Sequence, residues 1–119
     1  MTATTKRTVT IHAPYVIDAD ALWSRIWGAD PEGHSWYHSL RFLNGCNWEH
    51  HGTAEVVMED PEDEDKVVTY RVTVETLALA LSDLSFPDHL RRDILDDDAD
   101  CGSADGVIQQ AVYGEIVFG

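Results

Sequence analysis

Residues 54–74 read AEVVMEDPEDEDKVVTYRVTV, and this stretch predicts the centre of the fold. Its outer parts, 54–58 and 67–74, are rich in β-branched residues, a composition typical of strands. Residues 59–66 between them hold six carboxylates, one proline and one lysine, which is typical of an exposed turn. The stretch therefore predicts a β-hairpin with its charged residues at the tip.

Two further strands are expected on the N-terminal side of this hairpin. In residues 7–12 and 36–43, apolar and polar side chains alternate with the period of two that indicates a strand with one buried face. Pro14 should end the first of these strands. Asn44-Gly45 is a turn signal directly after the second.

The segment between these two strands predicts a short helix over residues 19–27. Asp18 is a favourable N-cap, and Gly28 is a favourable residue at which to stop. Trp23 and Trp27 lie four residues apart on one edge of this helix, so we expect both in the core.

Helices are also expected after the hairpin. Leu77, Leu81 and Leu84 recur at helical spacing, which predicts a helix over 74–84 with Thr73 as its N-cap. Ser85 and Asp88 then form a capping-box pattern ahead of a second helix that contains Leu90, Ile94 and Leu95.

The second of these helices should stop before residues 96–98, because each carboxylate at a helix C-terminus is unfavourable by about 0.3–1 kcal/mol. Ser103 and Asp105 are expected to open a last helix, and residues 115–118 suit either a helix or a strand. Together these elements predict a single α+β domain over residues 1–119. It should contain a small antiparallel sheet of three or four strands, packed by three or four short helices.

The charge of the chain is strongly negative and unevenly distributed. Among 119 residues there are 22 Asp and Glu and only 8 Lys and Arg, which gives a net charge of -14. Residues 59–119 hold sixteen of the 22 carboxylates. Such a surface repels nucleic acid and anionic lipid and attracts basic partners over a Debye length of about 8–10 Å at physiological salt. We therefore expect no direct binding to nucleic acid or to a membrane.

Twelve of these carboxylates form two clusters. The first is Glu59, Asp60, Glu62, Asp63, Glu64 and Asp65, and the second is Asp93, Asp96, Asp97, Asp98, Asp100 and Asp105. Carboxylates that serve only solubility or salt tolerance should spread over the whole surface, so their concentration here favours an interaction surface. An acidic surface that serves only solubility or salt tolerance stays an alternative. Trp48 lies in a polar stretch and is the expected exposed aromatic anchor. The predicted partner-binding residues are Glu59, Asp60, Glu62, Asp63, Glu64, Asp65, Asp96, Asp97, Asp98, Asp100 and Trp48.

A metal-binding or enzymatic module is a second alternative. It would use His34, His38, Cys46 and His50, which offer nitrogen and sulfur donors of the kind that zinc prefers. These residues lack a Cys-x2-Cys pair, and His34 and His38 suit a zinc site only if they lie on a helix, whereas 36–43 predicts a strand.

A calcium loop is also disfavoured. Asp96, Asp98 and Asp100 match the first acidic positions of an EF-hand, but Cys101 replaces the required glycine and Val107 the required glutamate. The chain has no Gly-x-Ser-x-Gly elbow and no glycine-rich phosphate loop. We therefore expect no catalytic residue, no cofactor and no bound metal.

Two further features concern the setting of the protein. Cys46 and Cys101 are too few for a disulfide framework and are expected as free thiols in a reducing compartment. Residues 1–10 are polar, unlike a secretory signal, and no stretch reaches the length of a membrane span.

Several stretches resemble small acidic proteins encoded by phages of actinobacteria. Residues 86–100 (FPDHLRRDILDDDAD) and 107–119 (VIQQAVYGEIVFG) resemble their carboxyl-terminal part, and residues 36–48 (WYHSLRFLNGCNW) and 52–61 resemble their middle. Their motifs have no known chemistry, so no catalytic residue is carried over. The resemblance implies a small protein in the cytoplasm of an infected host cell, where such products often bind host or defence proteins.

These observations lead to one functional hypothesis. We expect a small acidic protein that binds and modulates or inhibits a basic host or defence protein. One form of this hypothesis is that its carboxylates imitate the phosphates of nucleic acid, since DNA carries one charge per about 1.7 Å of its axis.

Overall fold

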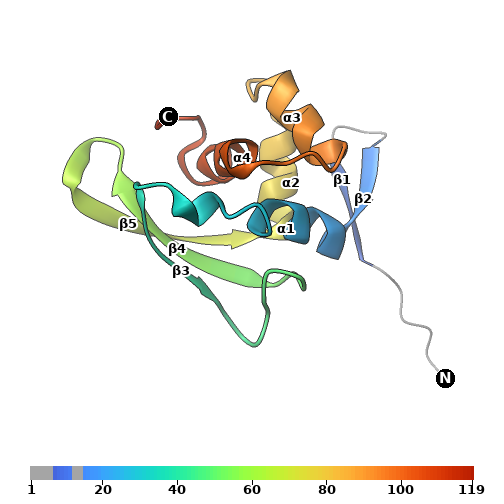
Figure 1. The fold of residues 1–119 in the computed structure, drawn as a ribbon, viewed down its shortest axis with the longest axis horizontal. Helices are drawn as coiled ribbons and strands as arrows, with labels where there is room; N and C mark the ends of the chain where they lie inside the picture. The colour runs from blue at the N-terminus through green and yellow to red at the C-terminus, as the bar shows by residue number, and fades with distance from the viewer. Residues whose placement is uncertain (1–6, 12–14) are drawn as a thin grey trace.

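The computed structural model describes residues 7–11 and 15–119 and confirms the predicted α+β fold (Figure 1). In this part of the chain, β3 (Tyr37–Phe42), β4 (Thr53–Asp60) and β5 (Asp63–Thr73) form an antiparallel sheet in the order β3-β4-β5. A separate hairpin consists of β1 (Thr8–Ile11) and β2 (Tyr15–Asp18). The helices are α1 (Ala19–Trp27), α2 (Val74–Ser82), α3 (Asp88–Leu95) and α4 (Cys101–Tyr113), with a 3-10 turn η1 (Pro31–Gly33).

The β4–β5 hairpin is confirmed, but its strands are longer than predicted. The paired register runs from Thr53 opposite Thr73 to Asp60 opposite Asp63, with one irregularity between Glu59 and Asp60. Only Pro61 and Glu62 lie outside the strands, so most of the predicted acidic turn belongs to the ladder. The backbone groups still pair because the charged side chains project into solvent at an exposed tip.

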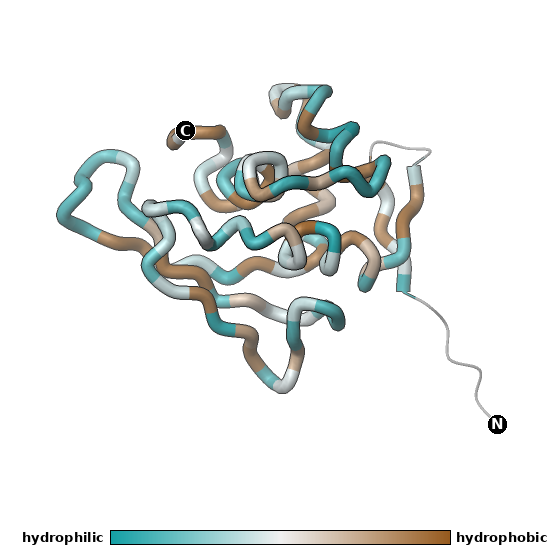
Figure 2. The backbone as a smooth tube through the Cα atoms, in the orientation of Figure 1, coloured by the Kyte–Doolittle hydropathy of each residue, from teal (hydrophilic) through white to brown (hydrophobic). Residues whose placement is uncertain are grey.

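The sheet buries one face against the helices. Ala54, Val56 and Met58 alternate along β4 and are fully buried. Figure 1 shows α2, α3 and α4 on the same side of the sheet, and Figure 2 shows the hydrophobic residues concentrated between these layers while the hairpin tip is hydrophilic. On the opposite face Glu55 pairs with Arg41 on β3 (3.0 Å) and with Arg71 on β5 (3.8 Å). This polar ladder suits the face of an antiparallel sheet that meets water.

The helix predicted over residues 19–27 is confirmed at both ends. The Asp18 carboxylate accepts a hydrogen bond from the Ala21 N–H at 3.0 Å, and Gly28 occupies the C-cap. Trp23 and Trp27 are both buried, as predicted, and their rings meet edge to face at 5.6 Å between centroids.

The strand predicted over 7–12 appears as β1, while its predicted last residue, His12, and the predicted stop at Pro14 lie outside the described residues. The sequence pattern did not predict β2. Its four residues include an exposed pair, Tyr15 and Val16, so it lacks the alternation that would indicate a half-buried strand.

The boundaries of α2 and α3 partly confirm the predictions. Thr73 and Thr76 form a capping box that starts α2, but the helix ends at Ser82, and Leu84 is exposed beyond it. The capping box predicted for Ser85 and Asp88 is wrong. The Ser85 N–H and hydroxyl instead donate to the Asp83 carboxylate, so α3 starts without a side-chain cap.

Helix α4 begins two residues before the predicted Ser103. Asp100 is its N-cap and accepts from the Ser103 N–H at 2.8 Å, while the Asp100 N–H donates to the Ser103 hydroxyl at 2.9 Å. Residues 103–110 are all buried, and α4 contacts α1, α2, α3, β5 and η1, so this helix is the centre of the helical layer. Residues 115–118, left open between helix and strand, adopt neither. None of the helices in the described ranges has the length and apolar character needed to cross a membrane.

The leucines of α2 provide a test of this packing. Leu77 and Leu81 are fully buried, while Leu79 on the same helix is 72% exposed. We expect Leu77→Ala or Leu81→Ala to reduce the free energy of unfolding by about 2–5 kcal/mol, because each leaves a cavity in the core. Leu79→Ala should change it by about 0.5 kcal/mol or less. Urea unfolding would measure all three, and equal losses at the three positions would contradict the assigned buried face.

Candidate functional site

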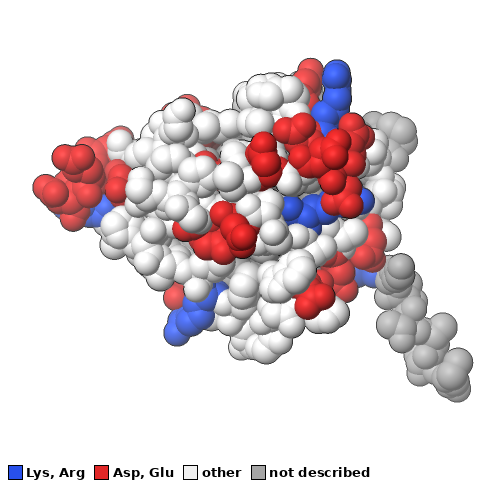
Figure 3. Space-filling view, viewed as in Figure 1, with Lys and Arg blue, Asp and Glu red and all other residues white. Residues whose placement is uncertain are grey.

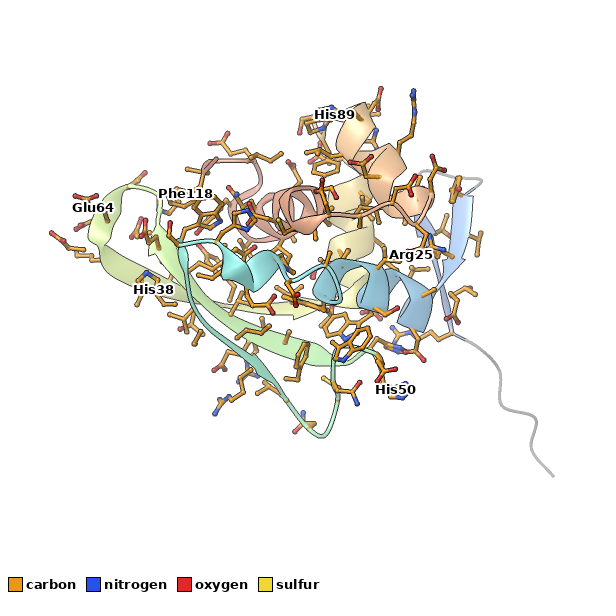
Figure 4. All side chains as sticks on the ribbon, in the orientation of Figure 1. Arg25, His38, His50, Glu64, His89 and Phe118 are labelled. Carbon is orange, nitrogen blue, oxygen red and sulfur yellow. The ribbon has the colours of Figure 1, made fainter. Side chains whose placement is uncertain are left out.

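The first predicted acidic cluster forms the projecting end of the β4–β5 hairpin. We call this surface the acidic tip; it comprises Glu59, Asp60, Glu62, Asp63, Glu64 and Asp65. Figure 3 shows a concentrated patch of carboxylates at this end of the molecule, and Figure 4 shows Glu64 at its outer limit. All six predicted residues are therefore brought together, with Glu59 half-buried at the base.

Hydrogen bonds hold the acidic tip in shape. The Asp60 carboxylate accepts from the Glu62 N–H at 2.9 Å, and the Asp63 carboxylate accepts from the Asp65 N–H at 3.0 Å. Lys66 lies 3.8 Å from Asp63. Among the described residues, no ion pair engages Glu62, Glu64 or Asp65. The tip therefore presents unneutralised carboxylates on an ordered backbone.

The second predicted cluster lies between α3 and α4, and we call Asp96, Asp97, Asp98 and Asp100 the acidic corner. It forms a separate patch from the acidic tip (Figure 3). As predicted, α3 ends before these residues. The main hydrogen-bond partner of the Asp100 carboxylate is the Ser103 backbone N–H, which holds the pKa of Asp100 below its usual value. Asp100 therefore has a capping role in α4.

Arg25 offsets the charge of the acidic corner. Its Nη1 donates to the carbonyl oxygens of Ile94 and Leu95, both at 3.1 Å, and its Nε lies 3.6 Å from the Asp97 carboxylate. A cation at the C-terminus of α3 interacts favourably with the helix dipole, whereas the adjacent carboxylates interact unfavourably with it. The acidic corner is therefore partly neutralised, at Asp97, and partly structural, at Asp100.

Asp93 and Asp105 were grouped with this corner in the sequence, and for Asp105 that grouping is wrong. Asp105 is only 4% exposed. Its Oδ1 accepts from Trp36 Nε1 at 2.9 Å and from the Tyr37 hydroxyl at 2.6 Å, and its Oδ2 accepts from Gln109 Nε2 at 2.7 Å. A buried carboxylate with three donors is satisfied, so Asp105 belongs to the core.

The hydrogen bonds extend from Asp105 to the C-terminal segment. Gln109 Oε1 accepts from the backbone N–H groups of Val117 and Phe118, both at 2.8 Å. The Phe118 ring stacks on Trp36 with centroids 5.6 Å apart, and His34 also stacks on Trp36, at 4.7 Å. This arrangement fixes residues 117–118 against α4 and against Trp36, which lies between η1 and β3, although residues 117–118 form neither a strand nor a helix.

Trp48, the predicted aromatic anchor, is 48% exposed on an ordered loop. The buried Trp23 donates from Nε1 to the Asn47 carbonyl oxygen at 2.7 Å. The Asn47 side chain in turn accepts from the backbone N–H groups of Glu49 and His50. These bonds on both sides of Trp48 hold its backbone while leaving the ring accessible.

A cavity of about 270 Å³ lies beside Trp48, and we call it the aromatic pocket; it is lined by Trp27, Gly28, Asp30, Glu32, Phe42 and Trp48. Its rings come from the end of α1, the end of β3 and the following loop. Sequence reasoning missed it, because nothing local indicates that Trp27, Phe42 and Trp48 meet.

The residues of the metal-binding alternative are not brought together. His38 lies 3.9 Å from Glu59, His50 lies 3.8 Å from Asp20, and Cys46 donates to the Thr53 carbonyl oxygen. Figure 4 shows His38 and His50 well apart. Across residues 7–11 and 15–119, no three His, Cys, Asp or Glu side chains form a group that could hold a metal ion, and both cysteines are free.

Ionisation of Tyr37 provides a test of the Asp105 hydrogen bonds. Burial, followed by the neighbouring Asp105 carboxylate, raises the pKa of Tyr37 above its ordinary value of 10.0. The unfolded chain then releases this proton at a lower pH than the folded chain, so the contribution of Tyr37 to stability is full below about pH 10 and declines above it.

We expect Tyr37→Phe to lower the free energy of unfolding by about 1–3 kcal/mol at neutral pH, because Asp105 loses a donor. The difference from the unmodified protein should shrink by up to about 1.4 kcal/mol for each pH unit above 10. Urea unfolding across this pH range would measure it. The other tyrosines are present in both proteins, so their ionisation cancels in the difference. A difference in unfolding free energy that stays constant above pH 10 would contradict the raised pKa of Tyr37.

Replacement of Arg25 tests the acidic corner. We expect Arg25→Gln to lower the free energy of unfolding by about 1–3 kcal/mol, because two carbonyl oxygens at the end of α3 lose a charged donor. Arg41→Gln removes the same charge from an exposed ion pair and should change it by about 1 kcal/mol or less. Thermal and urea unfolding would compare the two, and equal effects would contradict the role of Arg25.

Comparisons with protein-family models, with curated proteins and with solved structures give no match for this chain. The resemblance to small acidic phage proteins therefore stays a prediction. The function of the chain has to be inferred from its own geometry and charge.

Proposed function

We propose that this chain is a binding protein whose acidic tip engages a basic partner. The observation that carries the proposal is the set of unneutralised carboxylates, including Glu62, Glu64 and Asp65, on a hairpin end whose backbone is fixed by hydrogen bonds. Because the tip is ordered before binding, a partner meets a defined array of charges and the entropy lost on association is small.

The distribution of charge supports binding more than solubility alone. A coat for solubility has no need for concentrated carboxylates, since like charges repel one another. At the acidic corner, Arg25 pairs with Asp97, and Asp100 is held as the N-cap of α4. At the acidic tip, Lys66 is the only Lys or Arg that forms an ion pair within the described residues, and His38 lies 3.9 Å from Glu59. A positively charged protein surface would complete the neutralisation.

The partner class follows from this charge. We propose a nucleic-acid-binding host or defence protein in the cytoplasm of an infected host cell, whose phosphate-binding surface the acidic tip occupies. Binding there would modulate or inhibit the partner. Affinity should fall steeply with salt, and DNA should compete for the same surface.

Matched charge variants test the proposal. Basic proteins captured from a host lysate would be titrated against the Glu62→Gln/Glu64→Gln variant and against Glu49→Gln/Glu115→Gln, which removes the same charge elsewhere. We expect the tip variant to weaken binding roughly 3- to 30-fold and the control to have little effect. The affinity of the unmodified chain should also fall between low and physiological salt.

Two results would contradict the proposal. Equal binding by both variants, or binding without salt dependence, would leave the acidic tip without a role in recognition. The carboxylates would then serve solubility or salt tolerance.

A further inference from the structure

The aromatic pocket has a chemical character distinct from that of the acidic tip. Trp27 and Phe42 meet edge to face at 5.8 Å between centroids, with an interplanar angle of 88°. Trp48 packs over Gly28, where an added Cβ would lie 3.1 Å from the Trp48 ring. The carboxylates of Asp30 and Glu32 complete the wall. Three aromatic rings beside two acids form a setting that favours an organic cation.

Unsatisfied polar atoms occur in two residues of this wall. Glu32 Oε2 and Trp27 Nε1 are enclosed and have no hydrogen-bond partner among the described residues. A buried carboxylate oxygen without a donor is costly, by about 1–3 kcal/mol or more. Glu32 as a whole is half-buried and lines the pocket.

The carboxylates of Asp30 and Glu32 are not neutralised within the described residues. There, no Lys, Arg or His forms an ion pair with either of them. A ligand that suits these carboxylates therefore carries positive charge and N–H donors. A quaternary ammonium lacks donors, and a lysine ammonium lacks a flat face for the rings. A guanidinium has both, with five N–H groups on a plane that stacks on aromatic side chains.

We propose that the aromatic pocket binds an arginine side chain of the basic partner; this inference rests on the proposed function. Glu32 and Asp30 accept hydrogen bonds from the guanidinium, and Trp48 stacks on its plane. An arginine in a peptide also presents its aliphatic stem to the exposed Trp48 ring, so the pocket favours a peptide arginine over free guanidinium.

The tryptophan indole N–H signals give a readout that is specific to each site. The ¹⁵N-labelled chain would be titrated with N-acetyl-arginine-methylamide, its lysine counterpart and guanidinium chloride. We expect the arginine compound to shift the Trp27 and Trp48 signals while the Trp36 signal, whose N–H is bonded to Asp105, stays in place. The lysine compound and free guanidinium should each bind about tenfold more weakly. Equal shifts with all three, or shifts confined to other signals, would overturn the inference.

Variants separate the pocket from the rest of the surface. Glu32→Gln should weaken binding of the arginine compound about tenfold, because a charge-assisted hydrogen bond is lost. Glu49→Gln, on the Trp48 loop but outside the pocket, is the matched control and should bind as the unmodified chain does. An unchanged Trp23 signal would show that the loop still packs on α1 in each variant. Equal binding by Glu32→Gln and Glu49→Gln would overturn the inference.

The two proposals fail in different ways. The Glu62→Gln/Glu64→Gln variant should bind the arginine compound with unchanged affinity, since the acidic tip lies on another part of the molecule. If no arginine compound binds but the tip variant still weakens partner binding, only the pocket inference fails. If the arginine compound binds but partner affinity is independent of the tip, only the proposed function fails.

Discussion

The buried carboxylate of Asp105 is the interaction on which the arrangement of the other elements depends. It accepts hydrogen bonds from Trp36, Tyr37 and Gln109, and so joins the start of β3 to the central helix α4. A carboxylate in an apolar interior is tolerated only when its oxygens are satisfied, which requires these donors to be in place together. The contact therefore fixes how the helical layer sits on the sheet.

The same connection reaches the acidic tip. Gln109 binds the backbone of residues 117–118, and the Tyr113 hydroxyl, also on α4, donates to the Glu59 carbonyl oxygen at 2.6 Å. The Glu59 N–H donates to the Trp36 carbonyl oxygen at 3.0 Å. The base of the hairpin is thus held from two sides, and a strand pair that projects from a small sheet keeps a defined direction. Repulsion among the tip carboxylates acts on side chains in solvent and leaves this base intact.

Features set by neighbouring residues could be predicted from the sequence, and features set by distant contacts could not. Asp18 and Thr73 mark helix starts because a cap needs only the next three residues. The hairpin follows from β-branched strands on either side of an acidic turn. Asp105, by contrast, lies nine residues or fewer from four other aspartates, and its burial depends on Trp36 and Tyr37, which are 69 and 68 residues away. The Ser85 cap failed for a local reason, since Asp83 offered a competing acceptor.

The separation of the carboxylates into three environments limits what overall charge can say about function. A net charge of -14 suggests one acidic surface, but Arg25 compensates Asp97 at the corner, Trp36 and Tyr37 bury Asp105, and the tip and the aromatic pocket combine order with unneutralised charge. Long-range attraction of a basic partner depends on the total charge, so every exposed carboxylate contributes to the association rate. The dissociation rate of the complex depends instead on the groups that lose water at the interface. Most differences in affinity between related complexes are differences in this rate. Asp30 and Glu32 beside Trp27, Phe42 and Trp48 can provide such groups, because aromatic walls exclude water around a charged pair. The acidic tip and the aromatic pocket therefore suit different steps of one association, the first acting at a distance and the second after contact.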